Sequence, residues 1–201
     1  MPDFLEVLKT RRSIRQYKHR TIPKEIILEM LDLCRYAANA HNSQPFRFIV
    51  ILNTDLKKRL INAMTARYEL DLRRDGVSKT TIQKIITHSK TRFLKAPVLI
   101  VACLTMEDMD HYPDQERQRC EFIMGVQSVA NTLQNLLLIA HARGFGACWY
   151  CAPLFAPDTV KEVLNLPSSY LPQAFITLGI PDETPPPITR KPLEDLIKIL
   201  E

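Results

Sequence analysis

The residues with the most obvious chemistry lie near the amino terminus, where residues 10–17 read TRRSIRQY. Three arginines, Arg11, Arg12 and Arg15, surround one serine, Ser13. Guanidinium groups match phosphate oxygens in a bidentate way, and the serine adds a hydroxyl and a backbone N–H as further donors. Arginines are also common as solvated charges at helix ends, so charge alone leaves both interpretations open. We treat the stretch as a candidate anion site.

A second basic pair, Arg190 and Lys191, follows three consecutive prolines near the carboxyl terminus. The pair precedes the segment PLEDLI, which has the apolar spacing of a short amphipathic helix. It offers the same anion-binding chemistry as the arginines near the amino terminus, far away in the sequence.

A third polar stretch, AANAHNSQPFRF, occupies residues 37–48 between a predicted helix and a predicted strand. Its side chains are amides, an imidazole and a hydroxyl, contributed by Asn39, His41, Asn42, Ser43 and Gln44. Amide groups here could bind the edge of a planar heterocycle, which alternates hydrogen-bond donors and acceptors. The alternative is a turn whose polar side chains satisfy the end of the preceding helix.

Several other chemistries lack their sequence signals. There is no phosphate-binding glycine loop, since the chain has five glycines and the pair Gly144 and Gly146 follows a helix and lacks a third partner. No serine has a nucleophile motif, and the five histidines are scattered, so the sequence predicts no catalytic triad and no metal site. The C-x-x-C at residues 148–151 has no second ligand pair, and we interpret it as small residues on a buried strand.

Composition sets the class of protein. The 201 residues are 46% hydrophobic and 24% charged, which suits one globular domain, residues 1–201, with its own core. The net charge of +5 would allow a nucleic-acid surface, but basic residues alternate with acidic ones, which disfavours it. No single apolar run reaches the roughly 18 residues of a membrane span, and the amino terminus lacks the charge order of a signal peptide. We therefore expect a cytoplasmic protein, with no membrane and no nucleic acid as partner.

Hydrophobic periodicity predicts an α+β domain in which helices wrap a small mixed sheet as three layers. Strands are predicted at 46–52, 97–105, 147–155 and 173–181, and the second should be buried on both faces. Helices are predicted at 3–10, 23–40, 55–74, 80–94, 117–142 and 156–166, with a last amphipathic helix in the tail. The helix at 117–142 is apolar nearly all round, so it should lie in the core or in a subunit interface.

The three polar stretches together resemble the nitroreductase family of flavin enzymes. That family has an RRSxRxF motif near its amino terminus, here RRSIRQY. A PSxxNxQPW motif follows its second helix, here AANAHNSQPF, and a basic segment with proline precedes its last helix, here TRKPLEDLI. Within the family, stretches such as LGIPDETPPP resemble the flavin domains that mature the 5-deazaflavin coenzyme. Asn39 and Phe46 depart from the usual serine and tryptophan.

The resemblance implies a nitroreductase-like fold with a long central helix, in an intertwined homodimer that holds FMN at the subunit interface. It implies no catalytic side chain, because the flavin does the chemistry. The cofactor-binding residues that it implies are Arg11, Arg12, Ser13, Arg15, Asn39, Asn42, Gln44, Cys151, Ala152, Arg190 and Lys191. Part of the second motif would reach the flavin of the partner, and Asp71 would hold a deazaflavin substrate.

Two functions follow as hypotheses. The first is an FMN-dependent oxidoreductase that passes hydride from a reduced nicotinamide, NAD(P)H, or a reduced deazaflavin to an electron-poor acceptor. Acceptors of this class are nitroaromatics, quinones and activated alkenes such as a dehydro precursor of the deazaflavin coenzyme. The second is a module that binds flavin or deazaflavin for a separate glutamyl ligase, without turnover of its own.

Overall fold

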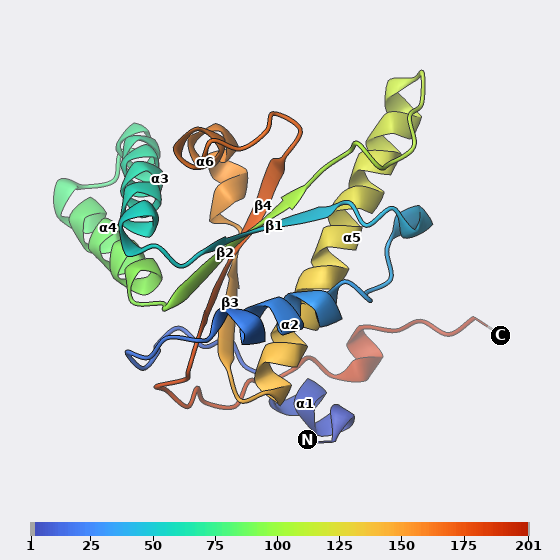
Figure 1. Ribbon diagram of the computed structural model, residues 1–201, viewed down its shortest axis with the longest axis horizontal. Coiled ribbons are helices and arrows are strands. Elements are labelled where there is room, and N and C mark those ends of the chain that lie inside the picture. Colours follow the sequence, from blue (N-terminus) through green and yellow to red (C-terminus); the bar gives the residue numbers. More distant parts are fainter. Residues whose placement is uncertain (1–2, 201) are drawn as a thin grey trace.

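A computed structural model of the protein describes residues 3–200. Its helices are α1 (Phe4–Thr10), α2 (Lys24–Cys34), α3 (Thr54–Arg74), α4 (Lys79–Leu94), α5 (Gln115–Ala142) and α6 (Pro157–Leu164). Its strands are β1 (Phe46–Ile51), β2 (Val98–Leu104), β3 (Gly146–Tyr150) and β4 (Leu171–Gly179). Three short 3₁₀ turns occur at η1 (Ala40–Asn42), η2 (Ala152–Phe155) and η3 (Leu193–Asp195). The predicted α+β class and the order of the elements are confirmed (Figure 1).

The four strands form one sheet in the order β1-β2-β4-β3, and every strand pair is antiparallel. The sheet was predicted to be mixed, and this detail is corrected. Parallel pairing among the described residues is limited to one bridge between Ser13 and Ala147 at the outer edge of β3. Apart from that bridge, β3 pairs only with β4, so much of its outer edge is unpaired within the described chain.

Helices cover both faces of the sheet, which gives the three predicted layers (Figure 1). Alternate side chains of β2 point to opposite faces. Ile100 and Leu104 pack in the cluster formed with α2 and α5, whereas Leu99 and Val101 pack with α3 and α6. All seven residues of β2 are buried, which confirms the predicted central strand.

The longest helix, α5, begins two residues before its predicted start and ends where the sequence predicted. Asp114 caps it, because its carboxylate accepts a hydrogen bond of 2.8 Å from the backbone N–H of Arg117. Within the described chain, α5 is the helix that by length and composition alone could cross a membrane, although polar residues such as Gln127 and Asn131 interrupt its apolar runs. Its buried residues include Leu133 and Leu136, which belong to the core shared with α2 and the sheet.

Two predicted helices are much shorter in the structure. The helix predicted over 23–40 ends at Cys34, because the chain turns off toward α5. There Ser128 Oγ accepts from the N–H of Ala40 at 3.0 Å, and Asn131 donates to the carbonyl of Ala38 at 3.2 Å. The predicted last helix is reduced to the 3₁₀ turn at 193–195, and the apolar side chains around it are exposed. A short amphipathic helix needs a surface for its apolar face, and one chain offers none here.

Candidate functional site

The segment RRSIRQY lies along the edge of the sheet. The backbone N–H of Ile14 donates to the carbonyl of Ala147 on β3 at 3.0 Å, and the N–H of Lys18 donates to Ile180 beyond β4 at 2.9 Å. Gly146 makes this approach possible, because a Cβ at that position would lie 2.6 Å from the side chain of Ile14. The sequence therefore places Ser13 and its neighbouring arginines beside the open edge of β3.

Tyr17 anchors the same segment from within. Its hydroxyl lies 2.5 Å from the carbonyl of Ile14 and 2.7 Å from Thr177 Oγ1 on β4. Burial raises the pKa of Tyr17 far above its ordinary value, and the hydrogen bond to Thr177 offsets only part of that increase. The tyrosine thus stays neutral, and its hydrogen bonds hold the arginine segment in place against β4.

The structure brings the two distant basic stretches together. Burial lowers the pKa of Arg11, and the positive charges of Arg190 and Arg12 lower it further. One guanidinium nitrogen of Arg12, Nη1, donates to the carbonyls of Lys9 and Arg11, each at 2.9 Å. Lys191 follows Arg190 directly on the exposed tail.

No side-chain ion pair is made by these arginines in the part of the chain that the structure describes. The ion pairs of residues 3–200 include none made by Arg11, Arg12, Arg15 or Arg190. The nearby Glu183 accepts instead from two backbone groups, the N–H of Arg15 and, at 3.1 Å, that of Gln16. Converging cations whose guanidinium groups have no ion-pair partner form a site that favours an anion.

The sequence did not single out two residues of this region. Glu183 positions the backbone of the arginine segment, and His141 of α5 lies 2.9 Å from the hydroxyl of Thr10 at the end of α1. Burial and the charges of Arg11 and Arg12 lower the pKa of His141, so it adds no charge to the cluster at neutral pH. Both contacts join residues more than 130 positions apart, and no local motif marks them.

The amide stretch forms a tight turn of its own. Asn39 closes it, because its side-chain oxygen accepts from the N–H of Gln44 at 2.8 Å and its nitrogen donates to Ala37 at 3.1 Å. His41, Asn42 and Gln44 all have left-handed backbone angles, with φ of 55°, 53° and 50°. Asn39 therefore stabilises the turn, while the side chains of Asn42 and Gln44 are exposed.

Within one chain, this turn lies far from the arginines. The turn contacts α5 at Ser128 and Asn131, whereas the end of α1 contacts α5 at His141. Ten to thirteen residues of helix separate these contacts, which corresponds to about 15–20 Å. Figure 1 shows the same arrangement, with α1 beside the lower end of α5 and the turn beside its upper half.

A pocket of about 590 Å³ lies between α3, α4, the turn η2 and β4, within the size range of small-molecule sites. It brings together Asp71 and Ala152, two residues that the sequence placed in the site. Its apolar lining consists mainly of Ile61, Met64, Phe93, Phe155 and Phe175. At its rim, Asp71 forms an ion pair of 3.1 Å with Arg67.

The edge of β3 connects the arginine cluster with this pocket. Ala147 lies beside Ser13, and Cys151 follows the end of the strand four residues later, about 13 Å away. Cys148 is buried and Cys151 is exposed, both as free thiols, so only the first fits the predicted buried strand. An anion site at one end and an apolar pocket at the other suit an elongated ligand with a charged end and a flat ring.

The three α+β layers, with basic residues and an apolar pocket along one sheet edge, define the class of fold, and comparison with known proteins identifies the family. Residues 8–180 match the model of the nitroreductase family, and the chain belongs to that family. It is 30% identical to a proposed NADH dehydrogenase/NAD(P)H nitroreductase of Methanothermobacter thermautotrophicus over 91% of this chain and 80% of that one. It is 28% identical to YfhC of Bacillus subtilis, a proposed NAD(P)H nitroreductase, over 94% and 90% of the two chains.

The fold also resembles solved structures. A proposed nitroreductase from Desulfovibrio desulfuricans, crystallised in complex with FMN, superimposes with a TM-score of 0.75 at 23% identity. The match covers 100% of this chain and 98% of the other. The likeness confirms the nitroreductase-like fold that the three sequence motifs predicted.

Proposed function

We propose that this protein is an FMN-dependent oxidoreductase that passes hydride from a reduced nicotinamide or deazaflavin to an electron-poor acceptor. The observation that carries the proposal is the cluster of Arg11, Arg12 and Arg190, which has no carboxylate partner among residues 3–200 and stands at the open edge of β3. A phosphate group would supply the missing negative charge. The FMN complex of the related fold supports the choice of ligand.

The chain's own residues would bind and orient the cofactor. The four arginines, with Ser13 and Lys191, would hold its phosphate, its ribityl chain and the pyrimidine edge of its ring. The backbone at Cys151 and Ala152, past the end of β3, would lie against the reactive side of that ring. When bound, FMN supplies hydride transfer at N5, so no side-chain nucleophile is needed.

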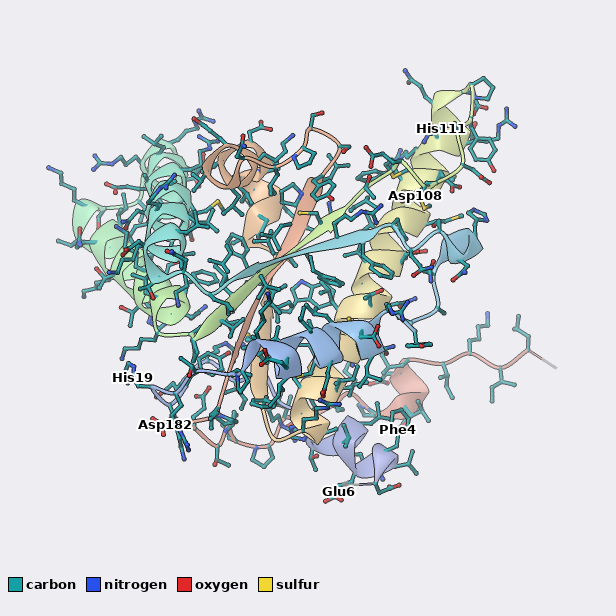
Figure 2. The ribbon with its side chains drawn as sticks, in the orientation of Figure 1. Phe4, Glu6, His19, Asp108, His111 and Asp182 are labelled. Atoms are coloured by element: carbon teal, nitrogen blue, oxygen red, sulfur yellow. The ribbon has the colours of Figure 1, made fainter. Side chains whose placement is uncertain are left out.

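We further propose a homodimer in which the amide turn serves the site of the partner. The turn lies about 15–20 Å along α5 from the arginines of its own chain, so the two groups cannot easily hold one ring system. Asn42 and Gln44 are exposed and free to face another subunit. Exposed apolar side chains on α1, such as Phe4, and on the tail offer an interface (Figure 2).

The acceptor would enter the pocket beside Ala152. Its apolar and aromatic lining suits flat molecules such as nitroaromatics, quinones or activated alkenes, including a dehydro precursor of the deazaflavin coenzyme. Asp71 is proposed as a substrate-binding residue, and its ion pair with Arg67 would hold its carboxylate at the rim. We place this activity in the cytoplasm, where reduced nicotinamides are available.

The alternative function is a flavin or deazaflavin module that serves a separate glutamyl ligase without turnover. The apolar pocket next to the proposed ring site favours the oxidoreductase, because a module that only holds a cofactor needs no adjoining cavity.

An absorbance spectrum of the purified protein, taken after desalting and again with added FMN, tests the proposal. We expect flavin bands that persist after desalting and bleach when NADH, NADPH or a reduced deazaflavin is added without oxygen. Bands that none of these donors bleaches would favour the binding module. A colourless protein that also fails to bind added FMN would contradict both functions.

A further inference from the structure

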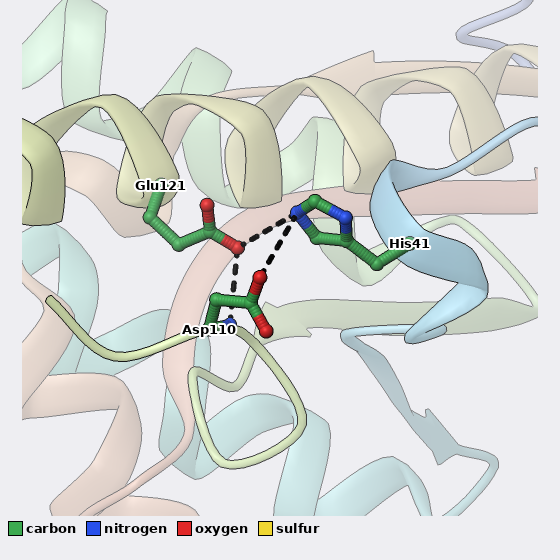
Figure 3. Close-up of side chains that lie close together, drawn as sticks. All are labelled: His41, Asp110 and Glu121. Atoms are coloured by element: carbon green, nitrogen blue, oxygen red, sulfur yellow. Dashed lines mark hydrogen bonds and ion pairs between the residues drawn. The ribbon is translucent and has the colours of Figure 1, made fainter.

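A histidine and two carboxylates from three separate segments meet at the upper end of α5. His41 comes from the amide turn, Asp110 from the loop before α5, and Glu121 from the helix itself (Figure 3). Their nearest ligand atoms all lie within 4.8 Å of one another. Sequence patterns do not predict this cluster, because its members are spread over 80 residues without metal-ligand spacing.

The charges of the cluster do not balance. The side chain of Glu121 is only 2% exposed, and a buried carboxylate is costly unless it is paired. Within the described chain its one ion-pair partner is His41, which must also face Asp110. The basic residue one turn earlier on α5, Arg117, pairs with Asp114 instead. Two carboxylates therefore share at most one positive charge, whereas a divalent cation would neutralise both.

The distances suit a small divalent ion. His41 Nε2 lies 3.2 Å from Glu121 Oε1 and 3.8 Å from Asp110 Oδ2. Ligand atoms about 2.0–2.1 Å from a tetrahedral zinc ion are roughly 3.3 Å apart, so small side-chain rotations would close the site. The backbone N–H of Asp110 donates to Glu121 Oε1 at 3.1 Å (Figure 3). Such a hydrogen bond orients a carboxylate ligand.

We propose that His41, Asp110 and Glu121 form a binding site for a divalent transition-metal ion such as Zn²⁺. One imidazole and two carboxylates leave a fourth position for water. His41 and Asp110 are 44% and 61% exposed, which gives an ion access from solvent. The bound ion would tie the amide turn and the loop 105–114 to α5.

Titration calorimetry with Zn²⁺ on the untagged, chelator-treated full-length protein tests the site. We expect one ion per chain, and binding at least about tenfold weaker in Glu121→Gln and in His41→Ala, since even the loss of an outer-shell partner has that effect. The controls His111→Ala and Cys120→Ser should bind as the unchanged protein does, because both residues are exposed and neither belongs to the cluster.

Thermal unfolding keeps the test independent of folding defects in the variants. Zn²⁺ should raise the unfolding temperature of the unchanged protein and of both controls, but not that of Glu121→Gln. If Glu121→Gln does not fold, the exposed Asp110→Asn takes its place with the same expectation. The proposal is overturned if the unchanged protein binds no Zn²⁺ at millimolar concentration, if the cluster variants bind it equally well, or if Cys120→Ser abolishes binding. None of these outcomes depends on FMN.

Discussion

At the scale of single residues, we predict that the arginine cluster has opposite effects on folding stability and on anion binding. Arg11 is partly buried beside Arg190 and Arg12, and both burial and repulsion lower its pKa. A base with a lowered pKa in the folded state disfavours folding at every pH where it is charged. Such an arrangement suits a binding site, where a ligand supplies the counter-charge.

The variant Arg11→Gln tests this argument. Without flavin we expect the free energy of unfolding to rise by about 0.5 kcal/mol, the scale of partly exposed charge interactions. Affinity for FMN should fall about 10- to 100-fold, because a hydrogen bond to a charged group contributes about 1.5–3 kcal/mol. Urea denaturation of the flavin-free protein and fluorescence titration with FMN measure the two effects.

The exposed Arg59 on α3, which forms no ion pair in the described residues, gives the matched control Arg59→Gln. It should change neither quantity. Equal losses of FMN affinity in both variants would show that overall charge matters and not the cluster.

Tyr17 carries a second prediction at this scale. Tyr17→Phe removes the hydroxyl bonded to Ile14 and Thr177, and we expect a loss of about 1–3 kcal/mol from the buried groups left unsatisfied. Burial raises the folded-state pKa of Tyr17, so the unchanged protein should lose stability as the pH rises above about 10, the unfolded value. The variant should lose less over that range. Urea denaturation at pH 8 and at pH 10.5 checks both statements, and an identical alkaline loss in the two proteins would refute the second.

At the scale of elements, the sequence predicted the strands and the long helices because each has its own hydrophobic period. The strand 98–104 is apolar throughout, and α5 is apolar over several turns. Hydrophobic periodicity predicted a helix in the tail that the structure lacks, because a short apolar pattern there has no surface to cover within one chain. It also could not show that the arginine segment pairs with β3, because that contact depends on a glycine 133 residues after Ser13.

Gly146→Ala tests how closely the arginine segment must approach the sheet. The added Cβ would lie 2.6–2.9 Å from three atoms near the branch point of Ile14, which cannot rotate away. We expect a loss of about 1–3 kcal/mol in the free energy of unfolding, as for overpacked cores, and weaker FMN binding. Gly125→Ala in α5 is the contrast, because its Cβ meets only the outer atoms of the Leu104 and Met106 side chains and alanine favours the helix. If Gly125→Ala costs as much as Gly146→Ala, close approach at β3 is not the cause.

At the scale of the whole molecule, the predicted site residues form three groups within one chain. The arginines converge with Arg190, Asp71 and Ala152 share a pocket, and the amide turn stands apart on α5. The motifs predict which residues form the site, but spacing along the chain could not say whether one chain or two would build it. The answer depends on how the chains assemble.

A dimer built from two different variants answers it. One subunit carries Arg11→Gln and the other carries Asn42→Asp, each with its own affinity tag, so that the mixed dimer can be purified. If each flavin takes its arginines from one subunit and its amide turn from the other, the mixed dimer has one intact site and one doubly defective site. We then expect tight binding of one FMN per mixed dimer, measured by fluorescence titration, although both parent homodimers bind weakly. If each site lies within one chain, the mixed dimer has two defective sites and binds as weakly as its parents.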